Sequence, residues 1–366
     1  MERNAMRVAV DGLWSAGMYG PCELVFEDGV LRGLEALGSG TVDARAALAL
    51  PLLSDLQVNG GGGVMVNSTP TAQALREIAA AHRRLGTGDI LPTVITDRAE
   101  VIEAAAEAAI EAAGDTGVLG LHIEGPHLAM ARRGTHNPAF IRPLDGRTVA
   151  VVRQLRGAGV PVMITLAPEL ADPALLAELV ASGAVVSAGH SAATAEEARA
   201  GFAAGISCVT HLYNAMEQMR SRAPGLLGAA INSRAHCGLI CDGIHVDWDM
   251  LRIALRGRPA PGLCFAVSDA MATVGGPESF VLYGEEIRVR DGRLVNAEGA
   301  LAGAHVDLRT SLANLVRQVG LPLAEAVAMV TDIPRRVMGL GPRLLRPGTA
   351  LDDMLLLDES FRPIPL

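Results

Sequence analysis

Short apolar runs alternate with alanine-rich amphipathic stretches along most of the chain. The apolar runs lie at 52–58, 89–95, 118–123, 161–166, 184–188, 206–210, 237–241 and 263–268. Amphipathic stretches of helical length lie at 71–86, 98–113, 172–182, 194–204 and 247–256. Eight strands that alternate with helices predict an α/β protein folded as a (β/α)8 TIM-like barrel. A doubly wound sheet is the alternative, but no G-x-G-x-x-G segment follows a strand, which favours the barrel.

The two ends of the chain have a different pattern. Residues 1–50 contain strand-like pieces and a turn, and helical periodicity begins only in an Ala- and Leu-rich stretch near residue 45. Segment 343–366 contains a further strand-like run, which we expect to pair with the N-terminal strands. The predicted organisation is a small β-sandwich domain built from residues 1–50 and 343–366, and a barrel from residues 51–342. A β-hairpin is expected as an insertion into the barrel near 279–296.

Composition narrows the classes of function. A chain with 50% hydrophobic and 19% charged residues is typical of a compact globular enzyme. The formal net charge of -9 provides no basic surface for nucleic acid, and no apolar run is long enough to span a membrane, so neither partner is expected. Five scattered cysteines and an N-terminus without a signal-peptide pattern predict a cytoplasmic protein. The chain contains no lysine, which excludes a carbamylated lysine as a metal ligand.

Polar residues follow the predicted strands at the points where the strands end. In a barrel, these carboxyl-terminal ends meet at one face, where active sites lie. The residues are Gln57 and Asn59 after the first strand, Glu124 after the third, His190 after the fifth, His211 after the sixth, Asp242 and His245 after the seventh, and Asp269 after the eighth. The pattern predicts that these side chains share one site.

Glu124, His190 and His211 are candidate metal ligands. Each alone is more often a hydrogen-bonded structural residue, but three together indicate an open catalytic site for one divalent metal, with zinc expected. Such a metal can activate water and polarise a carbonyl group. Asp269 is then placed to exchange protons with the water and a leaving group, with a turn or helix-cap aspartate as the equal alternative.

Other candidates carry weaker signals. His136 lies in a loop beside two arginines, where it is either solvated or placed to orient a substrate oxygen. Arg222 and His245 are candidates for binding an anionic group. His82 is expected on a helix surface, and the glycines at 60–63 are expected to form a flexible turn.

Together these segments resemble the N-acetylglucosamine-6-phosphate deacetylase family of the amidohydrolase superfamily, from about residue 50 to residue 340. The motifs are DLQVNG at 55–60, LHIEGP at 121–126, GTHNP at 134–138, SAGHS at 187–191, THLYNAM at 210–216, DGIHVD at 242–247 and SDA at 268–270. Superfamily members often have His-x-His where this chain has Gln57 and Asn59. Those two residues therefore resemble remnants of a second metal site, and the resemblance favours a single metal.

The resemblance implies a role for each matching residue. Glu124, His190 and His211 would bind one divalent metal ion per subunit, Asp269 would be general base and acid, and His136 would polarise the acetamide carbonyl. The implied substrate contacts are Asn214, the backbone of Ala215, Arg222 from the neighbouring subunit of a homodimer, and His245, with Arg222 and His245 on the phosphate.

The implied activity is hydrolysis of the acetamide of N-acetylglucosamine 6-phosphate, an amino-sugar phosphate. Departures from the family pattern at His127, at 221–225 and at His305 leave the sugar open. The alternatives are a deacylase of N-acetylgalactosamine 6-phosphate or of an unphosphorylated sugar, and a non-catalytic sugar-phosphate-binding protein. The last would be expected to lack a metal ligand or Asp269, and this chain has them all.

Overall fold

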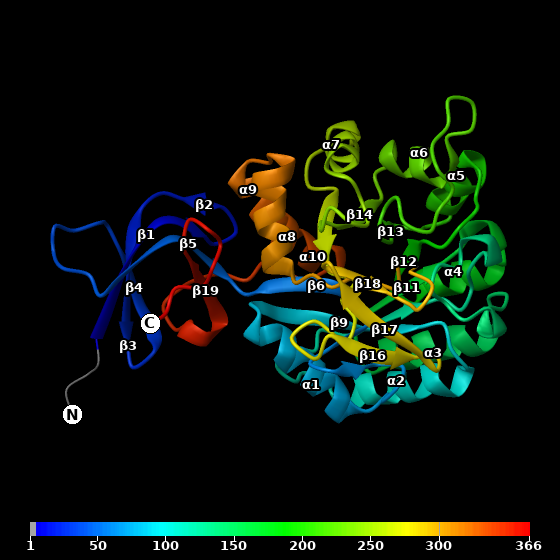
Figure 1. Ribbon diagram of the computed structural model, residues 1–366, viewed down its shortest axis with the longest axis horizontal. Helices are drawn as coiled ribbons and strands as arrows, with labels where there is room; N and C mark the ends of the chain where they lie inside the picture. Colours follow the sequence, from blue (N-terminus) through cyan, green and yellow to red (C-terminus); the bar gives the residue numbers. More distant parts are fainter. Residues whose placement is uncertain (1–4, 300) are drawn as a thin grey trace.

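The structure, a computed structural model, describes residues 5–299 and 301–366. At its centre is a sheet of eight parallel strands in the order β15-β14-β13-β12-β11-β10-β9-β6 (Figure 1). Their bounds are β6 (Leu53–Val58), β9 (Thr87–Ile95), β10 (Leu121–Glu124), β11 (Val162–Leu166), β12 (Val185–Ala188), β13 (Cys208–Val209), β14 (His236–Ile240) and β15 (Cys264–Val267). Each strand overlaps one of the eight apolar runs, so the strands are confirmed.

The two outer strands of this sheet, β6 and β15, are joined by residues at their carboxyl-terminal ends. Asp269 N donates to Gln57 O at 3.0 Å. Ser268 N donates to the Asp55 carboxylate at 3.2 Å. These contacts close the sheet into the predicted (β/α)8 barrel and exclude the doubly wound alternative.

Helices alternate with the strands and cover the outside of the barrel (Figure 1). The longer helices are α1 (Ala72–Arg84), α2 (Ala99–Glu111), α3 (Gly146–Gly157), α4 (Pro173–Ala181), α5 (Ala195–Ala203), α6 (Gly225–Ile231), α7 (Trp248–Gly257), α8 (Leu308–Asn314), α9 (Leu323–Val330) and α10 (Asp332–Val337). Short helical turns are η1 (Met130–Arg132), η2 (Pro138–Phe140), η3 (Pro168–Leu170), η4 (Leu315–Val319) and η5 (Leu351–Asp353). The five predicted helices correspond to α1, α2, α4, α5 and α7. Within the described parts of the chain, no helix has the length and apolarity that a bilayer crossing requires.

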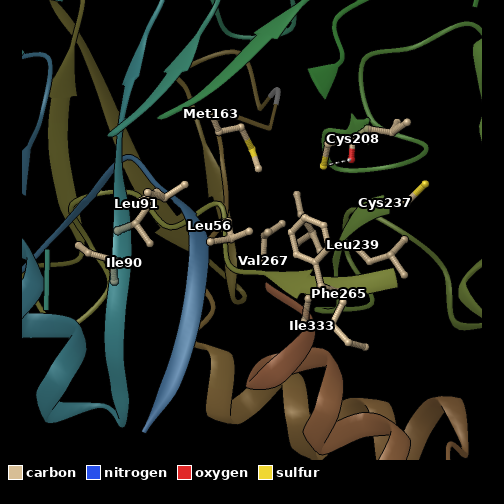
Figure 2. Close-up of a cluster of buried hydrophobic side chains, with 14 of the residues drawn as sticks. Leu56, Ile90, Leu91, Met163, Cys208, Cys237, Leu239, Phe265, Val267 and Ile333 are labelled. Carbon is tan, nitrogen blue, oxygen red and sulfur yellow. Dashed lines mark hydrogen bonds between the residues drawn. The ribbon is translucent and has the colours of Figure 1, made fainter. Parts of the chain in front are cut away.

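The barrel strands are buried on both faces, which explains their nearly continuous apolar runs. Every residue of β6, β9, β10 and β11 is buried. Helices cover the outer face of the sheet, as in other parallel sheets, and the side chains of the strands fill the inside of the barrel, so both faces exclude water. Figure 2 shows part of this core, in which Phe265 of β15 lies beside Ile333 of α10.

A second, six-stranded sheet combines residues from both ends of the chain, as the sequence predicted (Figure 1, left). Its strands are β1 (Ala5–Trp14), β2 (Met18–Tyr19), β3 (Cys22–Glu27), β4 (Val30–Glu35), β5 (Ala44–Pro51) and β19 (Met354–Leu357). It has its own apolar core, which includes Phe26 and Leu356. The helical interpretation of the Ala- and Leu-rich stretch near residue 45 is wrong, because β5 pairs there with both β1 and β19.

Two smaller sheets lie near the barrel mouth. The expected hairpin near 279–296 has a third strand: β16 (Ser279–Leu282), β17 (Glu285–Arg290) and β18 (Arg293–Val295) form one antiparallel sheet. The glycine run after the first barrel strand is an ordered hairpin of β7 (Gly60–Gly61) and β8 (Val64–Met65). A Cβ atom at Gly60 would lie 2.3 Å from Val64 O, so only glycine fits there.

The expectation that His82 lies on a helix surface is wrong. His82 is fully buried on α1, and its Nε2 lies 3.0 Å from Gly60 O. The ring packs so closely on the glycine hairpin that a Cβ atom at Gly61 would lie 2.8 Å from it. A polar residue occupies the buried face of α1 because the Gly60 carbonyl supplies a hydrogen bond.

Candidate active site

Three side chains with metal-binding atoms meet at the carboxyl-terminal ends of β10, β12 and β13. Glu124 is the last residue of β10, and His190 and His211 follow their strands by two residues. His190 Nε2 lies 3.1 Å and His211 Nε2 lies 3.0 Å from Glu124 Oε1, and the two nitrogens are 3.1 Å apart. All three residues are buried. Within residues 5–299 and 301–366, no other group of three His, Cys, Asp or Glu residues could hold a metal ion.

The surroundings of these residues fit a single divalent ion. His190 Nδ1 lies 2.9 Å from the carbonyl oxygen of Arg132, which can only accept, so Nδ1 carries the proton and Nε2 keeps its lone pair. His211 Nδ1 is buried and has no hydrogen-bond partner in the part of the chain that the structure describes. One carboxylate oxygen and two imidazole nitrogens form a donor set typical of catalytic zinc sites, which keep a further position open.

Asp269 lies two residues after β15 and is held by two amide side chains. Asn59 Nδ2 donates to Asp269 Oδ1 at 2.7 Å, and Gln57 Nε2 donates to the same oxygen at 3.1 Å. Gln57 Nε2 is also 3.1 Å from Glu124 Oε1, so one amide contacts both carboxylates. Neither amide contacts Asp269 Oδ2, which leaves that oxygen available for proton exchange.

His136 is buried although it belongs to a loop, between η1 and η2. Its ring meets the ring of His190 edge to face, with the centroids 4.3 Å apart. His136 Nδ1 is hydrogen-bonded to Thr96 Oγ1 at 2.7 Å. The solvated alternative for this loop histidine is therefore wrong, and the loop places it beside the metal-binding cluster.

These groups line a cavity of about 200 Å³ at the barrel mouth. The sequence-predicted residues that line it are Asn59, Glu124, His136, His190, His211, Asn214, Ala215, His245 and Asp269. Gln57 lies behind them, in contact with both carboxylates. Arg222 is exposed and does not line this cavity; it lines a separate surface hollow that includes Arg199 and Glu217.

Several cavity residues have left-handed backbone conformations. The φ angles are 49° at His190, 27° at His211, 49° at Ala215 and 52° at Asp269. For residues other than glycine this conformation costs about 1–3 kcal/mol each and persists where the surrounding structure enforces it, which is common at functional sites. The sequence predicted a role for each of these four residues, but positive φ angles also occur outside the cavity, for example at Asp28 and Asp291.

Comparison with known proteins agrees with this geometry. The family model described as "Amidohydrolase family" matches residues 48–344. The chain belongs to the amidohydrolase family. Members of this family use a metal, and the Glu124, His190 and His211 cluster could bind one in this amidohydrolase.

Named relatives resemble this amidohydrolase over most of its length. An N-acetylgalactosamine-6-phosphate deacetylase from Shewanella sp. (strain ANA-3) is 39% identical over 86% of this chain and 82% of the relative. An N-acetylglucosamine-6-phosphate deacetylase from Haemophilus influenzae is 34% identical over 84% and 81%. The crystal structure of N-acetylglucosamine-6-phosphate deacetylase from Pasteurella multocida has a TM-score of 0.86 at 29% identity and covers 98% of this chain and 97% of its own.

The two carboxylates in the cavity of this amidohydrolase have pKa values shifted in opposite directions. Burial, reinforced by the negative charge of Glu124, raises the pKa of Asp269 to about 6. Burial also opposes ionisation of Glu124, but its contacts with the imidazole rings of His190 and His211 outweigh this effect and hold the Glu124 pKa well below its usual range. With these opposite shifts, Glu124 stays charged as a metal ligand would, whereas Asp269 can exchange protons near neutral pH.

Sequence reasoning missed three residues that support this site in the amidohydrolase. Asp55 accepts hydrogen bonds from the backbone N–H groups of Gln57 and Ser268. It belongs to the DLQVNG motif, but the motif alone did not indicate this role. Thr96 contacts His136, and its position directly after β9 is the sequence signal that could have identified it. Tyr283, which contacts Thr96, had no signal of its own because it is distant in sequence.

Proposed function

We propose that this amidohydrolase hydrolyses the acetamide of N-acetylglucosamine 6-phosphate, giving glucosamine 6-phosphate and acetate. The observation that carries the proposal is the convergence of the Glu124, His190 and His211 cluster with Asp269 and His136 on one cavity. The printed names of the relatives from Haemophilus influenzae and Pasteurella multocida support the substrate. The five unpaired cysteines support the expected cytoplasmic location.

Glu124, His190 and His211 are the proposed ligands of one divalent ion per subunit, and we propose zinc because imidazole nitrogen suits this metal. When bound, such an ion supplies Lewis acidity, which activates water and polarises the amide carbonyl. The protein's part is to fix the ligands. His190 is oriented by the Arg132 carbonyl, and Glu124 is held by Gln57.

Asp269 is the proposed proton carrier. Its Oδ1 is occupied by the amides of Gln57 and Asn59, so Oδ2 is the oxygen that takes the proton from the attacking water. As the water oxygen bonds to the acetyl carbon, the carbon-nitrogen bond breaks and Asp269 returns the proton to the leaving nitrogen. Acetic acid and a free amine result, the acid ionises to acetate by losing the second proton of the water, and Asp269 is again ionised.

His136 is proposed to stabilise the charge that develops on the acetyl oxygen. A donor aimed at this oxygen stabilises the transition state more than the ground state, which is how an oxyanion hole accelerates acyl transfer. Burial and the edge-to-face contact with His190 hold the His136 ring in one orientation. Asn214 and the backbone of Ala215, which also line the cavity, are proposed to position the sugar ring.

The phosphate is proposed to bind between two subunits. His245 lines the cavity and is held by Asp242, whose Oδ2 lies 2.7 Å from His245 Nδ1. Arg222 is exposed and lies outside its own subunit's cavity. This placement supports a homodimer in which each Arg222 reaches the neighbouring site, where a guanidinium can bind phosphate through two hydrogen bonds.

One observation favours a second candidate substrate, N-acetylgalactosamine 6-phosphate. The relative from Shewanella sp., at 39% identity, is named for that sugar. The two sugars differ only in the configuration of the 4-hydroxyl group, so the same amide chemistry serves both. The gluco substrate is preferred here because several other relatives, and the solved structures from Pasteurella multocida and Mycobacterium smegmatis, are named for it.

Acetate release by the zinc-loaded protein tests the proposal. N-acetylglucosamine 6-phosphate, N-acetylgalactosamine 6-phosphate and unphosphorylated N-acetylglucosamine are compared by kcat/KM. The proposal expects the highest value for the first sugar and the lowest for the unphosphorylated one. A higher value for the galacto sugar would move the substrate to the second candidate, and no release from any sugar would overturn the proposed activity.

A further inference from the structure

Thr96 presents two polar groups to one nitrogen of His136. It lies directly after β9, at the same barrel face as the cavity. The Thr96 backbone N–H donates to His136 Nδ1 at 3.3 Å, and Thr96 Oγ1 lies 2.7 Å from the same nitrogen. The hydrogen bonds of the His136 ring to described residues are made through Nδ1, and the ring lines the cavity.

These contacts select one form of the His136 ring. A backbone N–H group can only donate, so Nδ1 must offer a lone pair, and a neutral ring then carries its proton on Nε2. In the opposite form, Nδ1–H would donate to Thr96 Oγ1, which would pass its own proton toward Glu124 O at 3.4 Å. That form keeps the 2.7 Å hydrogen bond with its direction reversed, but it brings two N–H groups face to face at 3.3 Å and leaves the Thr96 hydroxyl only the long contact to Glu124 O.

Thr96 is itself held in place by the sheet of β16, β17 and β18. Tyr283, at the turn between β16 and β17, donates from its hydroxyl group to Thr96 O at 2.5 Å. On the other side, Gly125 leaves the space that the Thr96 hydroxyl occupies, because a Cβ atom at Gly125 would lie 2.3 Å from Thr96 Oγ1. The position of the threonine is therefore set by elements far apart in the sequence.

We propose that Thr96, held in place by Tyr283, is a positioning residue that fixes His136 with its proton on Nε2. This inference rests on the proposed function in one respect, because it assigns the Nε2–H group as the donor to the acetyl oxygen. The inference also gives the sheet of β16, β17 and β18 a role at the active site. Tyr283, between β16 and β17, holds Thr96, and Thr96 determines which nitrogen of His136 carries the proton. Neither Thr96 nor Tyr283 touches the reacting atoms.

The variants separate this role from general packing. Thr96→Val removes the hydroxyl and keeps the shape, whereas Thr96→Ser keeps the hydroxyl. Tyr283→Phe removes only the second hydroxyl. Thr148→Val is the matched control, because Thr148 Oγ1 also bonds a buried histidine, His127 Nε2, at 3.0 Å, but outside the cavity.

The first measurement is the 15N NMR spectrum of histidine-labelled, zinc-loaded protein, with the His136 signals assigned by their loss in His136→Gln. The inference expects Nε2 protonated in the wild type and in Thr96→Ser. In Thr96→Val, which keeps the backbone N–H but loses the 2.7 Å hydrogen bond of the hydroxyl group, it expects a partial shift toward the Nδ1–H form. A proton on Nδ1 in the wild type would overturn it, as would an unchanged spectrum in Thr96→Val. This readout needs no substrate, so it stands even if the proposed activity fails.

The second measurement is steady-state kinetics on N-acetylglucosamine 6-phosphate. Thr96→Val should lower kcat about tenfold with little change in KM, less than the loss of about 10²–10³ that follows removal of an oxyanion donor itself. Thr96→Ser should restore kcat, and Thr148→Val should leave it unchanged. Tyr283→Phe should lower kcat in the same direction as Thr96→Val; an unchanged kcat would exclude Tyr283 from the positioning role.

Discussion

Asn59 donates a hydrogen bond of 2.7 Å from Nδ2 to Asp269 Oδ1, and so joins the end of the first barrel strand to the residue after the last. The bond favours the charged form of Asp269 and lowers its pKa against the effect of burial. It also leaves Oδ2 as the oxygen without an amide partner. The Asn59 amide therefore controls both the orientation and the acidity of the proposed proton carrier.

Replacing Asn59 with Ala should raise the pKa of Asp269 and reduce turnover. A hydrogen bond to a charged group contributes about 1.5–3 kcal/mol, and one pKa unit corresponds to about 1.4 kcal/mol, so a rise of roughly one to two units is expected. The acidic limb of the pH profile of kcat/KM should move to higher pH by this amount. Asn232→Ala, which removes an amide outside the cavity, is the control, and equal profiles for both variants would contradict the assignment.

The wild-type pH profile should itself report Asp269. The ionised carboxylate accepts the proton from water, so activity requires a pH above the Asp269 pKa, which burial raises to about 6. A cation bound at the neighbouring ligands lowers this value, because it favours the negative carboxylate. We expect kcat/KM of the metal-loaded enzyme to fall with an apparent pKa at or below about 6 as the pH decreases. A limb well above pH 6 would have to come from a different group.

Replacing His211 with Ala should release the metal. Three protein ligands hold the proposed ion, and loss of one leaves an incomplete set that binds at least about tenfold more weakly. The metal content of dialysed protein, measured by mass spectrometry, should fall from near one ion per subunit to a small fraction. His236→Ala is the matched control, since His236 is a half-buried histidine outside the cavity. Full retention of metal in His211→Ala would contradict the ligand set.

Asp89 should be important for stability rather than for catalysis. It is buried, and it forms ion pairs with Arg335 and Arg343, which tie the segment after α9 to β9. Asp89→Ala leaves the two arginines without their buried partner and should lower the free energy of unfolding by about 3 kcal/mol. Denaturant titration measures this loss. The exposed pair of Glu103 with Arg147 provides the contrast, because Glu103→Gln should shift the midpoint much less.

The barrel and most of the candidate site could be predicted because two strong patterns coincide. Strands buried on both faces produce apolar runs, and the runs end where Glu124, His190, His211 and Asp269 stand. Parallel strands bring such ends together whatever their separation in sequence. The types of these residues, one carboxylate and two imidazoles with a second carboxylate nearby, then indicated a metal site with a proton carrier.

Other features depend on tertiary contacts that local patterns do not contain. The stretch Ala44–Pro51 has a helical composition, but pairing with strands from both chain ends makes it β5. His82 is buried because one carbonyl, that of Gly60, is placed to bond it. Thr96 carries no chemical signal of its own, since its importance lies in what it does to His136.

The central claim is that Asp269 carries the proton while Glu124, His190 and His211 hold the metal. It is tested most directly by measuring acetate release and metal content in the same preparation of Asp269→Asn. The account predicts that metal content stays near that of the wild type and that kcat falls by about 10²–10⁴, the usual contribution of general acid-base catalysis. Near-normal turnover with the metal retained would contradict the account.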